Sequence, residues 1–148
     1  MVMVPTTELD RAATERLASH DLRYTSGRRM IVSVLRKADG PVTLPELLEL
    51  AGDVPQSSAY RNLSVMEEAG IVRRLVHGGD HAHFELAEEL TEHHHHLICE
   101  ACGSVQDFTL DAGLETALDE TFSRIASSAG ATVTGHTVDL FVTCSDCS

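Results

Sequence analysis

The chain has 148 residues, of which 43% are apolar, and a formal net charge of −12 at pH 7. This is the composition of a globular protein, and its length allows one ordinary domain or two small ones. No stretch approaches the roughly 18 consecutive apolar residues of a membrane-spanning helix, and the N-terminus lacks the charged start and apolar core of a secretion signal. We therefore expect a cytoplasmic protein with no membrane partner.

The charge is unevenly distributed along the chain. Residues 1–80 carry ten Lys and Arg against eleven Asp and Glu, whereas residues 81–148 carry one Arg against twelve acidic residues. Nearly every cation lies in the first half, so a polyanionic partner should bind there. The acidic second half suits the binding of cations.

Four helices are expected in the first half. Apolar residues recur at helical spacing in three stretches, residues 6–20, 27–37 and 56–69. Another helix should begin between the second and the third of these stretches. Thr43 can cap it, Pro45 falls in its first turn and Glu46 holds the capping-box position. Gly70 should end the last helix.

Two strands are expected to follow, over residues 71–76 and 82–86, with His77–Asp80 as the turn between them. Three helices and a two-stranded wing make a winged helix-turn-helix, here preceded by one extra helix. The second helix of such a pair enters the major groove with its N-terminal residues, so Tyr60 and Arg61 should contact DNA. The other residues expected at the DNA are Ser57, Ser58 and Arg28. Winged domains that bind proteins share this order of elements and are the alternative.

The densest group of possible metal ligands is His93–Cys102, which holds four imidazoles and two thiols in ten residues. Imidazole and thiolate bind zinc and its first-row neighbours. The apolar residues that follow the imidazoles indicate a strand, on which successive side chains point to opposite faces. His93 and His95 would then face one way, and His94 and His96 the other, so that one strand could supply two metal sites.

The second half should contain three strands, one helix and a hinge. The strands are expected over residues 93–99, 105–108 and 132–141, the helix over 111–127 and the acidic hinge over 88–92. The apolar residues of the helix share one face.

Two Cys-x-x-Cys pairs, Cys99 with Cys102 and Cys144 with Cys147, supply four thiolates. Four thiolates are enough to close a tetrahedral structural zinc site, which would link the last strand to the first. Disulfides are typical of secreted chains rather than cytosolic ones. A redox-active pair is a further alternative, but neither pair lies at the junction between a strand and a helix.

Two sites of nitrogen and oxygen donors can be built around the four imidazoles. The first would consist of His93, His95, Glu115 and His136, with His136 in the middle of the last strand. The second would consist of His94, His96, Glu85 and His83, with His81 as a further candidate. It would bridge the two halves of the chain. A zinc hydrolase with Glu85 or Glu115 as its base is another alternative, although no metal-hydrolase spacing such as H-E-x-x-H is present.

These features resemble the ferric uptake regulator (Fur) family, over roughly residues 20–147. The resemblance is carried by the order of elements, by SSAYRNL at Ser57–Leu63, by HHHHLICEACG at His93–Gly103, by His136 in GHTVDLF and by the closing CSDC. It implies an α+β protein with a winged helix-turn-helix DNA-binding domain followed by an α/β dimerisation domain. The corresponding boundaries are 1–86 for the DNA-binding domain, 87–92 for the hinge and 93–148 for the metal-binding dimerisation domain.

The resemblance also implies a function and assigns the sites. The chain would be a homodimeric repressor of metal homeostasis that senses iron or zinc and binds a palindromic operator in double-stranded DNA, and not an enzyme. A peroxide sensor that uses iron-catalysed oxidation of a His ligand is the alternative within the family. The four thiolates would hold structural Zn²⁺. A hinge sensor site for Fe²⁺ or Zn²⁺ would include Glu85, His94 and His96. The site of His93, His95, Glu115 and His136 would lie in the dimerisation domain. Many family members add a His ligand before the third helix, where this chain has Gly40 and Pro41.

Overall fold

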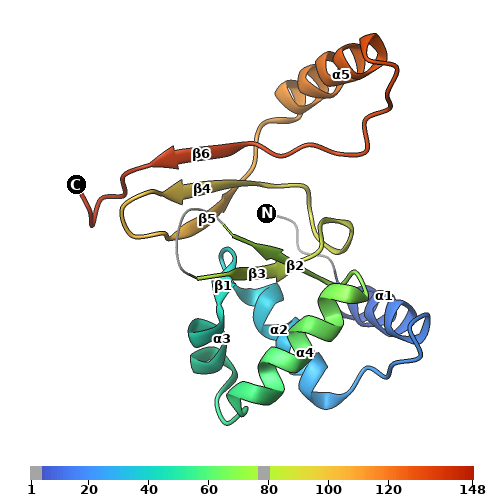
Figure 1. Cartoon of the computed structure of the whole chain (residues 1–148), viewed down its shortest axis with the longest axis vertical. Coiled ribbons are helices and arrows are strands. Elements are labelled where there is room, and N and C mark those ends of the chain that lie inside the picture. Colours follow the sequence, from blue (N-terminus) through green and yellow to red (C-terminus); the bar gives the residue numbers. More distant parts are fainter. Residues whose placement is uncertain (1–4, 77–80) are drawn as a thin grey trace.

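The computed structural model describes residues 5–76 and 81–148, and the two parts of the fold follow one another along the chain (Figure 1). The first part comprises α1 (Thr6–Ala18), α2 (Ser26–Lys37), β1 (Val42–Thr43), α3 (Leu44–Ala51), α4 (Gln56–Glu68), β2 (Val72–Leu75) and β3 (His83–Leu86). The second comprises a short 3-10 helix η1 (Glu88–Leu90), β4 (His95–Cys99), β5 (Val105–Phe108), α5 (Ala112–Ser128) and β6 (Asp139–Val142). The predicted α+β class is confirmed, while the predicted turn His77–Asp80 lies outside the described residues.

Local sequence signals account for the ends of the helices in the first part. The hydroxyl of Thr43 accepts a hydrogen bond from the Glu46 backbone N–H at 3.3 Å, and the Glu46 carboxylate accepts one from the Thr43 N–H at 3.2 Å. This is the expected capping box of α3. After α4 the chain turns at Gly70, whose φ of 77° lies in the left-handed region that glycine adopts without strain.

The core of the first part is a single apolar cluster to which α1 to α4 and the wing all contribute. Its fully buried side chains include Leu9, Leu17, Ile31, Leu47, Leu63, Met66 and Ile71. Burial of side chains of this size is the main force that holds a small domain together. The helices are therefore fixed relative to one another, and α4 is held with its first turns outward.

The wing is a three-stranded sheet in the order β1-β3-β2, in which β3 is antiparallel to both neighbours. Only two of these strands were predicted. β1 has two residues, too few to show the alternation that identifies a strand in a sequence. Its Val42 pairs with Phe84 of β3, which ties the turn after α2 to the wing.

The second part is built on a sheet in the order β5-β4-β6, with β4 antiparallel to β5 and parallel to β6. The last strand is shorter than predicted, because it begins at Asp139 rather than near Thr132. His136 therefore precedes the strand, and its predicted place in mid-strand is wrong. One reason is that the Val138 N–H donates to Nδ1 of His95 at 3.0 Å, so a side chain takes the place of a backbone partner.

Helix α5 stands apart from the sheet of its own chain (Figure 1). Asp111 caps it, because the Asp111 carboxylate accepts a hydrogen bond from the Leu114 N–H at 2.9 Å. The structure describes every residue of α5, and none of them is buried. Leu114 and Ile125 are 44% and 62% exposed. An amphipathic helix of this length normally buries one face. Across the described residues, no helix is long and apolar enough to span a membrane.

Candidate metal centres

Three groups of His, Cys, Asp and Glu side chains place their donor atoms within 4.8 Å of one another among the described residues. The Cys group consists of Cys99, Cys102, Cys144 and Cys147. The α5 group consists of His93, His95, Glu115 and His136. The hinge group consists of Glu85, His94, His96 and Asp107. The four consecutive histidines are divided alternately between the last two groups, as the alternation of side chains on a strand requires.

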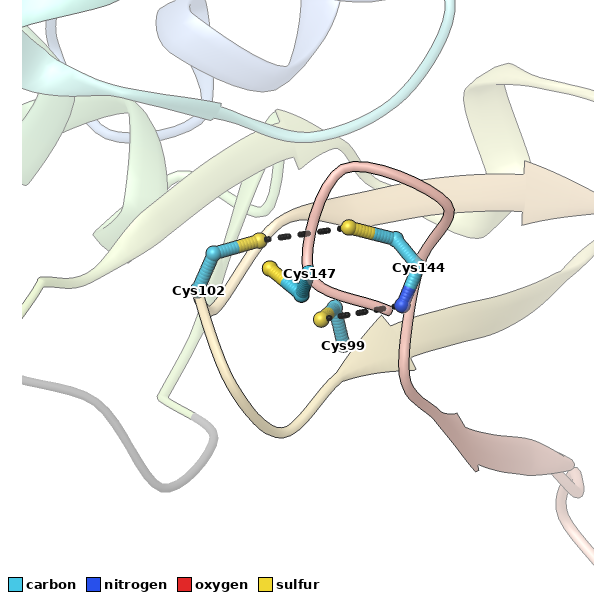
Figure 2. Close-up of side chains that lie close together, drawn as sticks. All are labelled: Cys99, Cys102, Cys144 and Cys147. Carbon is cyan, nitrogen blue, oxygen red and sulfur yellow. Dashed lines mark hydrogen bonds between the residues drawn. The ribbon is translucent and has the colours of Figure 1, made fainter.

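The Cys group is formed by two short turns at one end of the sheet (Figure 2). Cys99 ends β4, and Gly103, with a φ of 77°, turns the chain so that its N–H donates to the Cys99 carbonyl at 2.8 Å. Cys144 follows β6, and its N–H donates to Sγ of Cys99 at 3.4 Å. The sulfur atoms of Cys102 and Cys144 lie 3.8 Å apart, and all four cysteines are free thiols.

The spacing and charge of the Cys group fit a zinc ion. In a tetrahedron with Zn–S bonds of about 2.3 Å, the sulfurs lie about 3.8 Å apart. The backbone N–H of Cys144 is the main cause that lowers the pKa of Cys99, to about 6. The neighbouring thiols Cys144 and Cys102 raise the pKa of Cys147, to about 12. Four crowded sulfurs cannot all ionise without a cation, and a zinc ion supplies the missing positive charge.

The α5 group gathers three imidazoles around one carboxylate. Oε1 of Glu115 is hydrogen-bonded to Nε2 of His95, and Oε2 of Glu115 lies 3.0 Å from Nε2 of His136. The same oxygen lies 3.4 Å from Nε2 of His93. Although burial raises the pKa of Glu115, the hydrogen bond from His95 and the charge of His93 lower it overall, so the carboxylate is ionised.

Further groups hold the far side of each imidazole in the α5 group. Nδ1 of His93 is paired with Glu88 of η1, and Nδ1 of His136 lies 3.4 Å from Oδ1 of Asp119 on α5. Nδ1 of His95 is held by the Val138 N–H. All three rings therefore direct Nε2 toward Glu115. An outer carboxylate, as at His93 and His136, is typical of His residues that bind metal, whereas Nδ1 of His95 accepts a hydrogen bond from the backbone.

The hinge group joins the wing to the second sheet. Glu85 comes from β3, His96 from β4, His94 from the residue before β4, and Asp107 from β5. Oε2 of Glu85 lies 2.9 Å from Nε2 of His94 and 3.1 Å from Nε2 of His96. Oδ1 of Asp107 lies 3.8 and 3.7 Å from the same two nitrogens. Glu85 and His96 are almost fully buried, with 6% and 1% of their surface exposed.

Two oxygens of the hinge group lack hydrogen-bond partners among the described residues. They are Oε1 of Glu85, which lies 4.0 Å from Nη1 of Arg73, and Oδ1 of Asp107, and both are buried. Buried polar atoms are normally hydrogen-bonded, so a pair of unsatisfied carboxylate oxygens beside two imidazoles fits a cation site. The residues present thus suit a divalent metal with mixed nitrogen and oxygen ligands.

The charges in the hinge group are strongly coupled. Its hydrogen bond to Glu85 raises the pKa of His94 to about 9. Burial acts to raise the pKa of Glu85, but the hydrogen bonds from His94 and His96 outweigh it and lower the pKa to about 2. Burial raises the pKa of Asp107 to about 6. In the metal-free protein a proton on His94 therefore holds the position that a cation would take.

A sequence model of the ferric uptake regulators matches residues 19–141. The chain belongs to the ferric uptake regulator family. The ferric uptake regulation protein of Vibrio parahaemolyticus is 33% identical over 138 residues, which are 89% of this chain and 87% of the relative. The peroxide operon regulator of Bacillus subtilis is 31% identical over 140 residues, which are 92% of this chain and 91% of the relative.

The structure agrees with this assignment. The ferric uptake regulator of Helicobacter pylori has the same fold, with a TM-score of 0.74 at 22% identity over 99% of this chain and 96% of the other. This Fur-family chain is a metal-responsive, DNA-binding transcriptional regulator and not an enzyme, so the zinc-hydrolase alternative is wrong. The matches fit a response to metal and do not favour the peroxide alternative.

One residue expected in the hinge site of this Fur-family chain lies elsewhere in the structure. His83 lies outside the hinge group, and Asp107 occupies the fourth position instead. His83 is on β3, two residues before Glu85, and it faces Thr43 and Leu75 across the wing. His81 is exposed and also lies outside the group.

Sequence reasoning could have found Asp107. The Cys99–Gly103 turn joins β4 and β5 as a hairpin, and its register pairs Ile98 with Val105. Counting back along the hairpin places Asp107 opposite His96. Residues directly opposite on antiparallel strands have neighbouring side chains, so an acid at this position is a natural fourth donor.

The residues expected at DNA lie at the start of α4, with one exception. Ser57, Tyr60 and Arg61 are exposed, Tyr60 by 51%, while Ser58 is half-buried. Arg28 lies on α2, where its guanidinium donates to Oδ1 of Asn62 at 3.2 Å and to the Arg23 carbonyl at 2.7 Å. Arg28 therefore connects α2 to α4 within the protein.

Proposed function

We propose that this chain is a homodimeric repressor in which a divalent metal at the hinge group sets the affinity for a palindromic DNA operator. The observation that carries the proposal is that the hinge ligands come from both parts of the fold. Glu85 belongs to the wing, whereas His94, His96 and Asp107 belong to the second part of the fold. The proposed boundaries are a DNA-binding domain over residues 1–86, a hinge over 87–92 and a dimerisation domain over 93–148.

The hinge group supports a switch because its donors can converge only when the two parts are close together. The cation, when bound, supplies the charge that lets two carboxylates approach each other. A ligand shifts an equilibrium toward the state that it binds better, so metal favours the closed arrangement. Closure then fixes the wing and α4 relative to the dimerisation domain, and through it relative to the second subunit.

The exposed face of α5 supports the dimer. Leu114 and Ile125 lie on a helix that its own chain leaves uncovered, and a second copy offers an identical apolar face. Interfaces of two-fold symmetric dimers are self-complementary in this way. Two copies of α4 related by a two-fold axis would read two half-sites roughly 34 Å apart, and for this reason we propose a palindromic operator.

The surface of α4 supports DNA as the partner of the first part. Tyr60 and Arg61 are assigned to the bases and to the phosphates, with Ser57 and Ser58 beside them. Arg28 is assigned to the DNA backbone as well as to its contacts with Arg23 and Asn62. All but one of the Lys and Arg residues of the chain lie within residues 1–80.

The Cys group and the α5 group are assigned supporting roles. Cys99, Cys102, Cys144 and Cys147 would hold a structural Zn²⁺ that joins the ends of β4 and β6. His93, His95, Glu115 and His136 would hold a second ion, Zn²⁺ or Fe²⁺, that ties α5 to the sheet. The Helicobacter pylori regulator, which shares this fold, is described as having three functional metal binding sites.

The deciding experiment measures operator binding as a function of metal in His94→Ala and in the unchanged protein. We expect protein that retains its Cys-group zinc to bind the operator at least about tenfold more tightly with metal at the hinge than without it, because allosteric couplings are typically of this size. His94→Ala should lose that response, because it removes a buried donor. His81→Ala is the matched control, since His81 is exposed and lies outside the group. Equal operator affinity with and without metal in the unchanged protein would contradict the proposal.

The same experiment includes a test of the structural zinc. Cys99→Ala should lose cooperative folding, because folding of a structural zinc site depends on its full ligand set. His94→Ala should keep the zinc ion of the Cys group and a cooperative unfolding transition. A folded, cooperative Cys99→Ala protein without zinc would count against the structural role.

A further inference from the structure

Gly40 lies where the first part of the fold touches the second sheet. A Cβ atom at Gly40 would be 3.0 Å from the Val105 carbonyl oxygen, 3.2 Å from Cα of Gln106 and 3.3 Å from the backbone nitrogen of Asp107. All three atoms belong to the backbone of β5. These distances are shorter than most contacts that a Cβ atom makes, and the contact to Cα is shorter than the ordinary carbon–carbon range of about 3.5–4.0 Å, so a methyl group would not fit without a small movement.

Movement of β5 would be costly. Its residues pair with β4 along the whole strand, from Val105 opposite Ile98 to Phe108 opposite His95. A flexible side chain could turn away from an added methyl group, but a paired strand cannot shift alone. The turn that contains Gly40 would therefore have to withdraw from the sheet.

The conformation of Gly40 does not itself require glycine. Its φ lies outside the left-handed region, in contrast to that of Gly70, so alanine could adopt the same backbone without strain. The close approach to β5 is the remaining physical reason for a residue without a side chain at this position.

The contact at Gly40 is connected to the hinge group on both sides. On the sheet side, β5 carries Asp107, whose backbone nitrogen is one of the three close atoms. On the wing side, Gly40 is two residues from Val42, which pairs with Phe84 next to Glu85. The two elements that meet at Gly40 thus supply the two carboxylates of the hinge group.

We propose that Gly40 is a positioning residue for the hinge site: its lack of a side chain lets the turn after α2 lie flush on β5, which brings Glu85 within reach of His94, His96 and Asp107. The inference rests on the proposed function. The turn contributes a contact surface to the closed state rather than a metal ligand. Gly40 acts through the geometry of the closed state and touches neither metal nor DNA.

The test compares Gly40→Ala with the unchanged protein in a titration of operator binding against metal. The substitution disfavours the closed state, and the apparent affinity of a ligand falls with the population of the state that binds it. We expect the metal concentration for half-maximal operator binding to rise about tenfold, as overpacking of a tight contact would produce. Saturating metal should restore operator affinity to the value of the unchanged protein.

Asp39→Ala is the matched control, because it introduces the same side chain one residue away at an exposed position of the same turn. It should leave the metal titration unchanged. Metal affinity should also be measured without DNA, by competition with a chelator, and should show the same tenfold loss in Gly40→Ala alone. The zinc content of the Cys group and the cooperativity of thermal unfolding should be the same in all three proteins.

Each other outcome overturns a distinct statement. An unchanged metal titration in Gly40→Ala, with a metal-responsive unchanged protein, would overturn the role of Gly40 and leave the proposed function standing. Weak operator binding that saturating metal fails to restore would assign Gly40 to the DNA surface or to the fold, and would overturn the inference, as would loss of folding. Absence of a metal response in the unchanged protein would instead refute the proposed function.

Discussion

Glu85 pairs with two imidazoles through one carboxylate oxygen, while its other oxygen is buried without a hydrogen bond among the described residues. The hydrogen bond to Glu85 raises the pKa of His94 to about 9, so the imidazole of His94 is protonated at neutral pH. Without metal, the hinge group therefore contains the ion pair of His94 and Glu85 beside Asp107, whose Oδ1 has no hydrogen bond among the described residues. Binding of a cation at this position must release the proton from His94.

The proton on His94 should make metal binding at the hinge depend on pH. Below about pH 9 the metal-free protein carries the His94 proton that a cation has to displace, so metal affinity at the hinge should rise with pH. Release of one proton corresponds to about a tenfold change in affinity per pH unit, which we expect between about pH 7 and 8.5. Below a pH of about 6 the dependence should be steeper, because Asp107 is then protonated as well.

Competition with a chelator of known pH dependence at several pH values measures this slope. Glu85→Gln is the informative control. Without the Glu85 carboxylate, the main cause that raises the pKa of His94 is gone. Metal affinity should then be lower overall and should depend less on pH above about pH 7. A hinge affinity in the unchanged protein that is independent of pH between 7 and 8.5 would contradict the assignment.

At the scale of the element, β4 and the residues that lead into it supply imidazoles to both faces of one sheet. The partners on the two faces differ in kind. The hinge group completes its set with two carboxylates, from Glu85 and Asp107, whereas the α5 group has three imidazoles and one carboxylate. Carboxylate oxygens suit manganese, while imidazole suits zinc, so we expect the two groups, as metal sites, to differ in preference.

This difference predicts the order in which the two sites fill. With both sites emptied and a limiting amount of Zn²⁺ added, zinc should enter the α5 group first. Metal analysis of two variants assigns the site: His136→Ala should lose the tightly held zinc ion, whereas His94→Ala should retain it. The reverse pattern, with zinc lost from His94→Ala alone, would show that the number of imidazoles does not set the preference.

Which elements the sequence reveals depends on how local their signals are. Helix α3 was predicted through Thr43 and Glu46, and the capping box depends on no other part of the chain. β1 was missed, and β6 was predicted too long, because their extent is set by pairing with distant strands. Asp107 was missed for a related reason: its role depends on the register of a hairpin rather than on a motif.

His83 was expected in the hinge group but lies outside it, and the reason is also non-local. His83 and Glu85 alternate with Phe84 on β3, so the sequence offered both side chains as donors on one face. Only three-dimensional placement shows that His83 lies outside the group, whereas Asp107 follows from the register of the β4–β5 hairpin. The contact at Gly40 was also beyond the sequence, because its closest atoms belong to a strand more than sixty residues away.

At the scale of the whole molecule, the chain is divided between a compact first part and a second part with an uncovered helix. The first part buries a continuous apolar cluster, whereas α5 buries none of its described residues. Such a helix gains most of its stability from packing rather than from its own propensity. We therefore expect the second subunit of the proposed dimer to complete the second part of the fold.

The corresponding prediction is that Ile125→Asp weakens the dimer. A charge at this position would have to be buried against the partner without a counter-charge, which is strongly unfavourable. Sedimentation equilibrium should show a shift from dimer to monomer at low micromolar concentration, together with weaker operator binding. Ser127→Asp is the control, because Ser127 is exposed on the opposite side of α5. Equal association of the two variants would argue against this face as the interface.

The position of Glu85 on the wing has a consequence for occupancy in the cell. Equilibrium linkage is reciprocal. If an ion at the hinge raises the affinity of the protein for its operator, the operator must raise the affinity of the protein for the ion by the same factor. Protein bound to a promoter would accordingly retain its ion at free metal concentrations at which unbound protein loses it. Induction would then begin in the unbound pool and reach the promoter last.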